Sequence, residues 1–452
     1  METLSGLDSQ GGYSFKKIAY VTLPILFSML MEYLIGMTDT AFLGRVSEVA
    51  LGASAMGSVY FLTFFVLGSG FAFGAQILIG RRNGEQNFSS IGPICYAGGF
   101  FLILFSLLLM AFIKFSSPVI LPGIIQSESI CAATIEYLDW RLYGLLFVFI
   151  TAIYRSFYVG IARTAVLSWS SVIMVFSNIL LNYGLIFGKY GLPEMGVAGA
   201  ALASSIAEGI AMLCYIGYTC KRVDLKKYGF DRIRSSLDFS ILKKVFQVSF
   251  WMMVQSFVSV GVWFFFYVAV EHLGERSLAV INLARTLSGL PFILIHSFAT
   301  GGSSLISNLM GEGKAHLVWH LIRKVLCFAF AVVTPLLIFY ILFPELTLGI
   351  YTDNTALIRD SVPMMYVMSA ASFLQIAAFI LFNAVSGTGA IRAAVTIEFC
   401  NLFLYVLMVW IGILRLRPSP AAAWSVEIYY QTLTILFCIL YLFFGKWKEK
   451  KL

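Results

Sequence analysis

The chain has 452 residues, of which 60% are hydrophobic and 12% charged, with a mean hydropathy of +0.88 and a formal net charge of +8. A soluble domain is closer to half apolar and one quarter charged, so these values exclude a single aqueous core and place most of the chain in a lipid bilayer. The seven cysteines form no CxxC pair, and HExxH and GxxxxGK[ST] motifs are absent. We therefore expect an integral membrane protein that is not an enzyme, binds no metal or cofactor, and has no nucleic-acid partner.

Twelve segments are long enough to cross the hydrocarbon, which takes about 20 apolar residues. In chain order we predict helices over residues 18–43, 50–79, 92–116, 136–160, 166–188, 196–220, 241–270, 278–308, 321–348, 361–386, 393–414 and 421–445. The first twenty residues lack the apolar core and cleavage site of a secretory signal, so we expect the first helix to be retained.

An even number of spans places both termini on one side of the membrane. With both termini in the cytoplasm, 22 of the 31 lysines and arginines flank the inner helix ends and 9 flank the outer ends. This bias agrees with the positive-inside rule. We expect a multi-pass protein of the bacterial inner (plasma) membrane with cytoplasmic termini.

A basic run, KRVDLKKYGFDRIR (221–234), divides the twelve segments into six and six. FAFGAQILIGRRNGE (71–85) aligns with FATGGSSLISNLMGE (298–312), an offset of 227 positions. The predicted fold is all-α, with two pseudo-symmetric six-helix lobes related by a parallel repeat; such transporters bind substrate between the repeats and alternate access. The expected parts are a cytoplasmic N-terminal tail (1–15), an N-lobe (16–220), a cytoplasmic linker (221–240), a C-lobe (241–445) and a basic cytoplasmic tail (446–452).

Four motifs resemble those of the multidrug and toxic compound extrusion (MATE) family, in order and spacing. The first helix contains LPILFSMLMEYLIGMTDTAFLGR (23–45), and the others are SNILLNYGLIFG (177–188), GVAGAALAS (196–204) and SGTGAIR (386–392). The resemblance covers nearly the whole chain. Within the family, the chain is similar to the DinF-like branch. It implies two six-helix lobes and efflux driven by a proton or sodium gradient.

Two carboxylates, Glu32 and Asp39, lie inside the first helix. A charge at a helix centre costs about 2.5–3.5 kcal/mol on insertion scales, so such residues usually face the bundle interior and have a function. Their spacing of seven brings them within about 20° of one face and about 10 Å apart. Pro24 removes a backbone hydrogen bond and can bend the same helix, so we predict that bending responds to the charge on Asp39.

The resemblance implies that Asp39, Asn178, Asn182 and Ser204 form the N-lobe cation site. Many members carry Asp where this chain has Asn182, and Thr where it has Ser204. The missing charge favours protons over sodium, because hard cations prefer charged oxygen ligands. Glu32 or Glu208, one turn further along helix 6, would restore the charge; a structural hydrogen bond is the alternative for Glu208.

The C-lobe has fewer titratable candidates. Some branches carry acids in the seventh and tenth segments (241–270 and 361–386 here), but spacing places Gln255 and Gln375 at those positions, and neither can titrate. We therefore expect ion coupling in the N-lobe. Glu398, in the segment predicted as 393–414, either lines a substrate cavity with the two glutamines or pairs with Arg392. We predict that Arg155, at the inner end of helix 4, is an interfacial anchor.

The predicted function is secondary active efflux of amphipathic, often cationic, organic compounds in exchange for protons, with sodium as the less favoured ion. The alternative is a flippase for lipid-linked oligosaccharide or cell-wall precursors, disfavoured because few cations lie inside the membrane. The expected partners are small amphipathic molecules and the lipid bilayer, and we expect a monomer.

Overall fold

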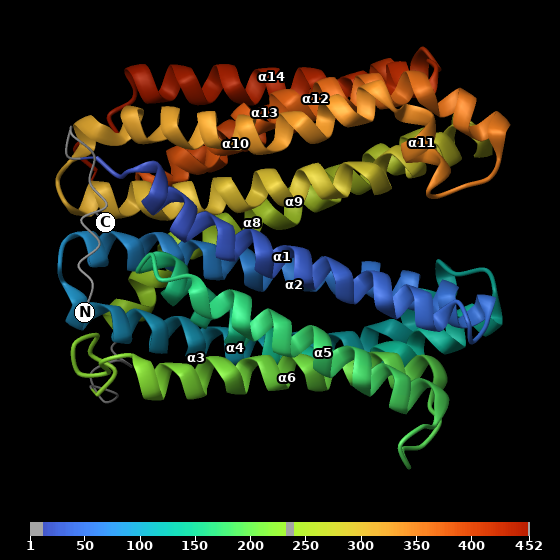
Figure 1. Cartoon of the computed structure of the whole chain (residues 1–452), viewed down its shortest axis with the longest axis horizontal. Coiled ribbons are helices and arrows are strands. Elements are labelled where there is room, and N and C mark those ends of the chain that lie inside the picture. The colour runs from blue at the N-terminus through green and yellow to red at the C-terminus, as the bar shows by residue number, and fades with distance from the viewer. Residues whose placement is uncertain (1–11, 232–238, 451–452) are drawn as a thin grey trace. The chain divides into compact units, whose positions relative to one another are not determined.

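The computed structural model describes residues 12–231 and 239–450, apart from the side chain of residue 275. Within these residues, twelve helices are long and apolar enough to cross a membrane, as predicted (Figure 1). They are α1 (Phe15–Leu43), α2 (Glu48–Gly84), α3 (Ile91–Ile120), α4 (Glu128–Gly160), α5 (Ala165–Phe187), α6 (Gly196–Arg222), α8 (Phe239–Glu271), α9 (Glu275–Gly311), α10 (Val318–Leu342), α12 (Thr355–Gly387), α13 (Ile391–Val409) and α14 (Pro420–Phe444). Short helical turns lie at Phe88–Ser90, Leu121–Gly123, Ala315–Leu317, α11 (Pro344–Gly349) and a π-helical turn Trp410–Arg415.

The predicted boundaries differ from the structure in two informative places. The segment predicted as 321–348 is two helices: α10 ends at Leu342, and α11 begins at Pro344. A proline disfavours the helical conformation of the residue before it, which here is Phe343. Helix α4 begins at residue 128 rather than 136, since the Ser127 hydroxyl accepts a hydrogen bond from the amide of Ile130 and caps it.

The backbone repeats at the offset predicted from the sequence. Helix α9 begins and ends 227 positions after α2 (48 to 275, 84 to 311), and α12 does the same relative to α4 (128 to 355, 160 to 387). The caps of α4 and α12 also match, because Ser127 and Asn354 each accept a backbone amide with the side chain. Gln86 and Gly313 share a positive φ directly after the equivalent helices. The sequence repeat therefore reflects a repeated fold.

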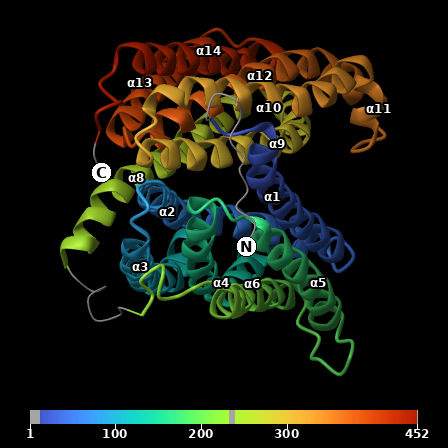
Figure 2. The same cartoon turned by 60° about the vertical axis from the view of Figure 1, so that its left-hand side comes forward.

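The chain forms two compact units by contact (Figure 2): residues 27–254, and residues 12–26 together with the described part of 255–450. Each boundary falls inside a helix, within α1 after Leu26 and within α8 after Val254. The lobes expected from the sequence are 16–220 and 241–445, with the division between them in the linker 221–240. The boundaries of the contact-based units lie elsewhere, after Leu26 and Val254. Residues 1–11 of the predicted tail, 232–238 of the predicted linker and 451–452 lie outside the described residues.

Both units have the same packing order. Helix α4 packs against α2, α3 and α6 in the first unit, and α12 packs against α9, α10 and α14 in the second. Small residues allow α2 to approach α4 closely: a Cβ added at Gly57 would lie 2.4 Å from the Tyr137 ring, and one at Gly68 would lie 2.2 Å from the Phe149 ring. Such close approach is typical of membrane helix contacts. Helix α4, which contains Arg141 and Arg155, is therefore the central helix of its unit.

Candidate ion-coupling site

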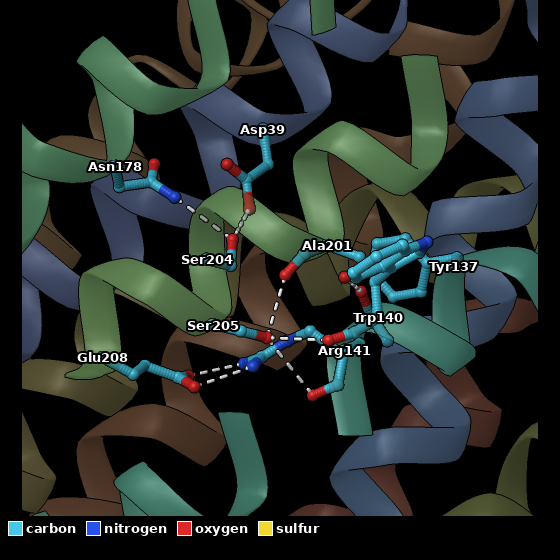
Figure 3. Close-up of polar contacts among 10 residues, drawn as sticks. Asp39, Tyr137, Trp140, Arg141, Asn178, Ala201, Ser204, Ser205 and Glu208 are labelled. Atoms are coloured by element: carbon cyan, nitrogen blue, oxygen red, sulfur yellow. Dashed lines mark hydrogen bonds and ion pairs between the residues drawn. The ribbon is translucent and has the colours of Figure 1, made fainter. Parts of the chain in front are cut away.

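Asp39 is the centre of a polar cluster formed by three helices (Figure 3). It lies four residues before the end of α1. One carboxylate oxygen accepts a hydrogen bond from Asn182 Nδ2 of α5 at 2.5 Å, and the other accepts from the Ser204 hydroxyl of α6 at 3.1 Å. Asn178 Nδ2 donates to the Ser204 hydroxyl at 3.1 Å. The structure thus brings together the four residues that the sequence grouped.

The helical spacing explains this arrangement. Asn178 and Asn182 are four residues apart on α5, so they share a face, and Asn182 Nδ2 also donates to Asn178 Oδ1 at 3.0 Å. Both asparagines are fully buried, and Ser204 is 6% exposed. The Oδ1 atom of Asn182 is buried without a hydrogen-bond partner among the described atoms. The cluster therefore has one unused acceptor beside the carboxylate.

A second acid, Glu208, lies one turn from Ser204 and is paired with an arginine. Arg141 of α4 donates to its two carboxylate oxygens at 2.8 and 2.6 Å (Figure 3). The Arg141 guanidinium also lies 4.0 Å from the centre of the Phe61 ring, and it interacts electrostatically with Asp39. Glu208 thus contacts Arg141 rather than completing the ligands of Asp39.

Glu32, the third acid, is also paired with an arginine. It accepts from Arg155 of α4 and, at 3.3 Å, from the Ser28 hydroxyl. Ser28 is hydrogen-bonded in turn to Ser171 of α5 at 2.6 Å. Arg155 is therefore the ion-pair partner of Glu32. The prediction that Arg155 is an interfacial anchor does not include this contact. Glu32 and Asp39 share α1, as predicted, but they belong to different polar clusters.

In the second unit, the three predicted cavity residues have different surroundings. Gln255 Nε2 donates to the Ser259 hydroxyl at 3.3 Å, and Ser259 donates to Glu398 at 2.9 Å. Gln375 of α12 is half-buried, and no contact joins it to this chain of hydrogen bonds in the described structure. Glu398 forms no ion pair with Arg392 among the described residues, so that alternative is wrong; Arg392 is exposed.

Sequence reasoning missed Arg141, which lies fourteen residues before Arg155 on α4. Fourteen residues are close to four turns of helix, so both arginines lie near one face of α4 and reach acids on α6 and α1. A detectable signal was present: opposite charges inside α4 and α6, Arg141 and Glu208, would each be costly in a membrane unless they were paired. The tyrosines around Glu398 gave no such signal, because aromatic residues are abundant throughout this chain.

Pro24 lies inside α1, which remains one continuous helix across it. The boundary between the two compact units falls two residues later, after Leu26. Pro24 and Asp39 therefore belong to different units although they share a helix.

Comparisons with known proteins agree with this architecture. The MatE family profile matches residues 24–187 and 252–411, once in each half. A probable multidrug resistance protein NorM of Thermotoga maritima is 26% identical, covering 96% of this chain and 93% of its own. Multidrug resistance protein MdtK of Pectobacterium atrosepticum is 23% identical over 83% of this chain and 81% of its own. A solved multidrug resistance MATE family transporter of the MOP superfamily, in an outward-facing conformation, aligns over both whole chains with a TM-score of 0.87 at 17% identity.

Proposed function

Since the chain belongs to the MatE family, whose members are transporters and not enzymes, we propose that it exports amphipathic, cationic organic compounds in exchange for protons bound at Asp39. The curated relatives are named as multidrug resistance proteins, which supports the substrate class. We further propose that it acts as a monomer in the bacterial inner membrane, with both termini in the cytoplasm.

One observation carries the assignment to Asp39. Glu32 and Glu208 are each held by an arginine, whereas Asp39 is held by the neutral donors Asn182 and Ser204. An acid that is paired with a fixed cation stays ionised through a transport cycle. An acid held by neutral groups can gain and lose a proton without leaving an unpaired arginine behind.

The neighbours of Asp39 can satisfy both of its protonation states. When ionised, the carboxylate accepts from Asn182 Nδ2 and the Ser204 hydroxyl. When protonated, it becomes a donor, and the unused Oδ1 of Asn182 or the Ser204 oxygen can accept. When Asp39 changes its protonation state, its hydrogen bonds can be rearranged by rotation of the Asn182 amide or the Ser204 hydroxyl. Such a rotation at the end of α1 is the local event that would be coupled to bending near Pro24.

The same contacts favour protons over sodium. A sodium site needs several oxygen ligands turned toward one point, but here Asn182 presents its nitrogen to Asp39. The second carboxylate on α6 that could add negative charge, Glu208, is held by both of its oxygens. Asp39 would then be the single negative charge of the site.

The flippase alternative receives no support from the interior charges. Binding a pyrophosphate group would call for free arginines or lysines in the membrane interior. Arg141 and Arg155, which do lie well inside α4, are occupied by Glu208 and Glu32. A vesicle assay that compares a fluorescent organic cation with a lipid-linked oligosaccharide would separate the two functions.

The direct test is transport by the purified protein in vesicles, with the proton and sodium gradients imposed independently. We expect the wild type to export a fluorescent organic cation under a proton gradient at any sodium concentration. Asp39→Asn should reduce gradient-driven export to the passive leak while the protein still binds the cation. Asp353→Asn, at an exposed loop position, is the matched control and should transport normally. Wild-type export by Asp39→Asn would refute the assignment, and dependence on sodium at a fixed proton gradient would refute proton coupling.

A further inference from the structure

The second unit contains a buried carboxylate that the proposed proton site does not use. Glu398 of α13 is 4% exposed. It accepts hydrogen bonds at one oxygen from the Ser259 hydroxyl of α8 at 2.9 Å and from the Tyr430 hydroxyl of α14 at 2.8 Å. Both donors are neutral, as they are at Asp39.

A second glutamate–tyrosine contact joins the same two helices, with the glutamate on α14 and the tyrosine on α13. Glu427 of α14 accepts from the Tyr405 hydroxyl of α13 at 2.7 Å. Each helix thus contributes one glutamate and one tyrosine. The rings of Tyr405 and Tyr430 lie 5.5 Å apart in an edge-to-face arrangement. The two carboxyl–tyrosine pairs are therefore adjacent parts of one polar cluster.

Glu398 has no positive partner in this cluster. No lysine, arginine or histidine forms an ion pair with it among the described residues. The titratable groups that interact with the Glu398–Tyr430 pair are Tyr405 of α13 and Glu427 and Cys438 of α14. Helix α8 contributes only the neutral Ser259 and Gln255, and α12 places its charged residues, Arg359 and Asp360, at its distant first turns.

The repeat shows what is missing. At the offset that relates α2 to α9, Ser259 corresponds to Glu32 and Glu398 corresponds to Ser171, so the acid and the hydroxyl have exchanged helices between the halves. In the first unit, Arg155 neutralises the acid. The residue that corresponds to Arg155 in the second half is Phe382. The second unit therefore has a carboxylate at this place in the fold but no arginine.

A fully buried acceptor beside the pair independently points to a ligand that can donate. Asn401 lies three residues after Glu398 and four before Tyr405, on the same face of α13. It is 0% exposed, and its Nδ2 donates to the Tyr430 carbonyl at 3.0 Å and to Thr434 at 2.5 Å. Its Oδ1 atom is buried without a partner among the described atoms. An isolated buried acceptor is costly unless a proton-bearing group occupies it.

We propose that Glu398 is a second proton-binding site, with Tyr430 and Ser259 as the groups that position its carboxyl and Glu427–Tyr405 as the adjacent pair. A buried carboxylate with neutral neighbours is stable as the acid and costly as the anion. The carboxylate would take up a proton from water on the outer side and release it to water on the inner side, so that no other reactant is needed. The coupling role rests on the proposed antiport at Asp39, whereas proton binding itself does not.

The experiment measures protonation directly, in the full-length protein reconstituted in lipid. Infrared difference spectra between acidic and alkaline buffer should contain the carbonyl stretches of protonated carboxylic acids, and the component band that belongs to Glu398 should be absent from Glu398→Gln. Tyr430→Phe should keep this band but shift its frequency, because one hydrogen bond to the carboxyl is lost. Glu345→Gln, at an exposed position of α11, is the matched control and should leave the band unchanged.

Transport then tests the coupling. In vesicles, the number of protons taken up per exported cation should fall by one in Glu398→Gln, while export persists. Asp39→Asn should stop driven export and still show the Glu398 band, so the two proposals can fail separately. The proposal is overturned if the band persists in Glu398→Gln or is unmoved in Tyr430→Phe, or if sodium at constant pH removes it, which would indicate a metal-cation site. Unchanged proton uptake by Glu398→Gln would refute the coupling role.

Discussion

The two halves of the molecule share a backbone but have different interior charges. Helices α2 and α9 have equal lengths and equivalent positions in the repeat, and so do α4 and α12. The first half places two arginines in α4 and pairs each with an acid from a neighbouring helix. At the corresponding places in α12 the chain has Met368 and Phe382, and the buried acids are held by hydroxyl groups instead.

This difference separates what the repeat must preserve from what function can change. The helix caps at Ser127 and Asn354 and the positive-φ residues Gln86 and Gly313 recur in both halves, so they belong to the repeated fold. A buried acid needs only a donor nearby, and an arginine or a tyrosine can serve. The choice of donor decides whether the acid stays ionised or can exchange a proton. The same scaffold therefore holds two arginine-paired acids beside the neutrally held Asp39 in the first half, and acids held by tyrosine and serine hydroxyl groups in the second.

The largest expected effect comes from breaking the more deeply buried ion pair. The Arg141 and Glu208 side chains are 13% and 14% exposed, so Arg141→Gln would leave a buried carboxylate without its cation. Breaking such a pair typically costs about 3–5 kcal/mol in the free energy of unfolding. Denaturant unfolding of the purified protein in mixed micelles would measure this loss.

Two further variants test the reason for that loss. Arg141→Gln combined with Glu208→Gln should recover most of the stability, because no unpaired charge remains. Glu398→Gln in the other half should unfold almost like the wild type, since an amide replaces a neutral acid of the same shape. A loss in Glu398→Gln as large as that in Arg141→Gln would contradict the contrast between the halves.

The sequence was sufficient to predict the helices and their repeat, because spanning a membrane imposes a length and an apolar composition on each helix. It also grouped Asp39, Asn178, Asn182 and Ser204, because the i, i+4 spacing and the family motifs left little freedom. The partners of Glu32, Glu208 and Glu398 were not predictable in the same way. Which acid meets which arginine or tyrosine depends on the rotation of packed helices about their axes, and spacing along one helix does not determine that rotation.

An intermediate effect is expected from crowding the same ion pair without removing a charge. A Cβ added at Gly144 would lie 2.2 Å from Arg141 Nη1 and 2.3 Å from Glu208 Oε2. Gly144→Ala should therefore displace the two charged groups, at a cost of about 1–3 kcal/mol, as is usual for overpacking. Gly217→Ala on α6, where a Cβ would meet nothing within 4 Å, is the matched control. Equal unfolding free energies for the two variants would show that the ion pair tolerates the extra methyl group.

The smallest effect is expected at the other ion pair of the first half. The Arg155 and Glu32 side chains are 28% and 37% exposed, which is at least twice the exposure of the Arg141 and Glu208 side chains, so less desolvated charge is left behind when the pair is broken. Glu32→Gln should lower the free energy of unfolding by no more than about 1 kcal/mol, as is typical of exposed pairs. It should also leave gradient-driven export intact, because Asp39 and its donors are unchanged. A loss comparable to that of Arg141→Gln, or abolished export, would mean that Glu32 shares the coupling role with Asp39, and the distinction between arginine-paired and hydroxyl-held acids would no longer hold.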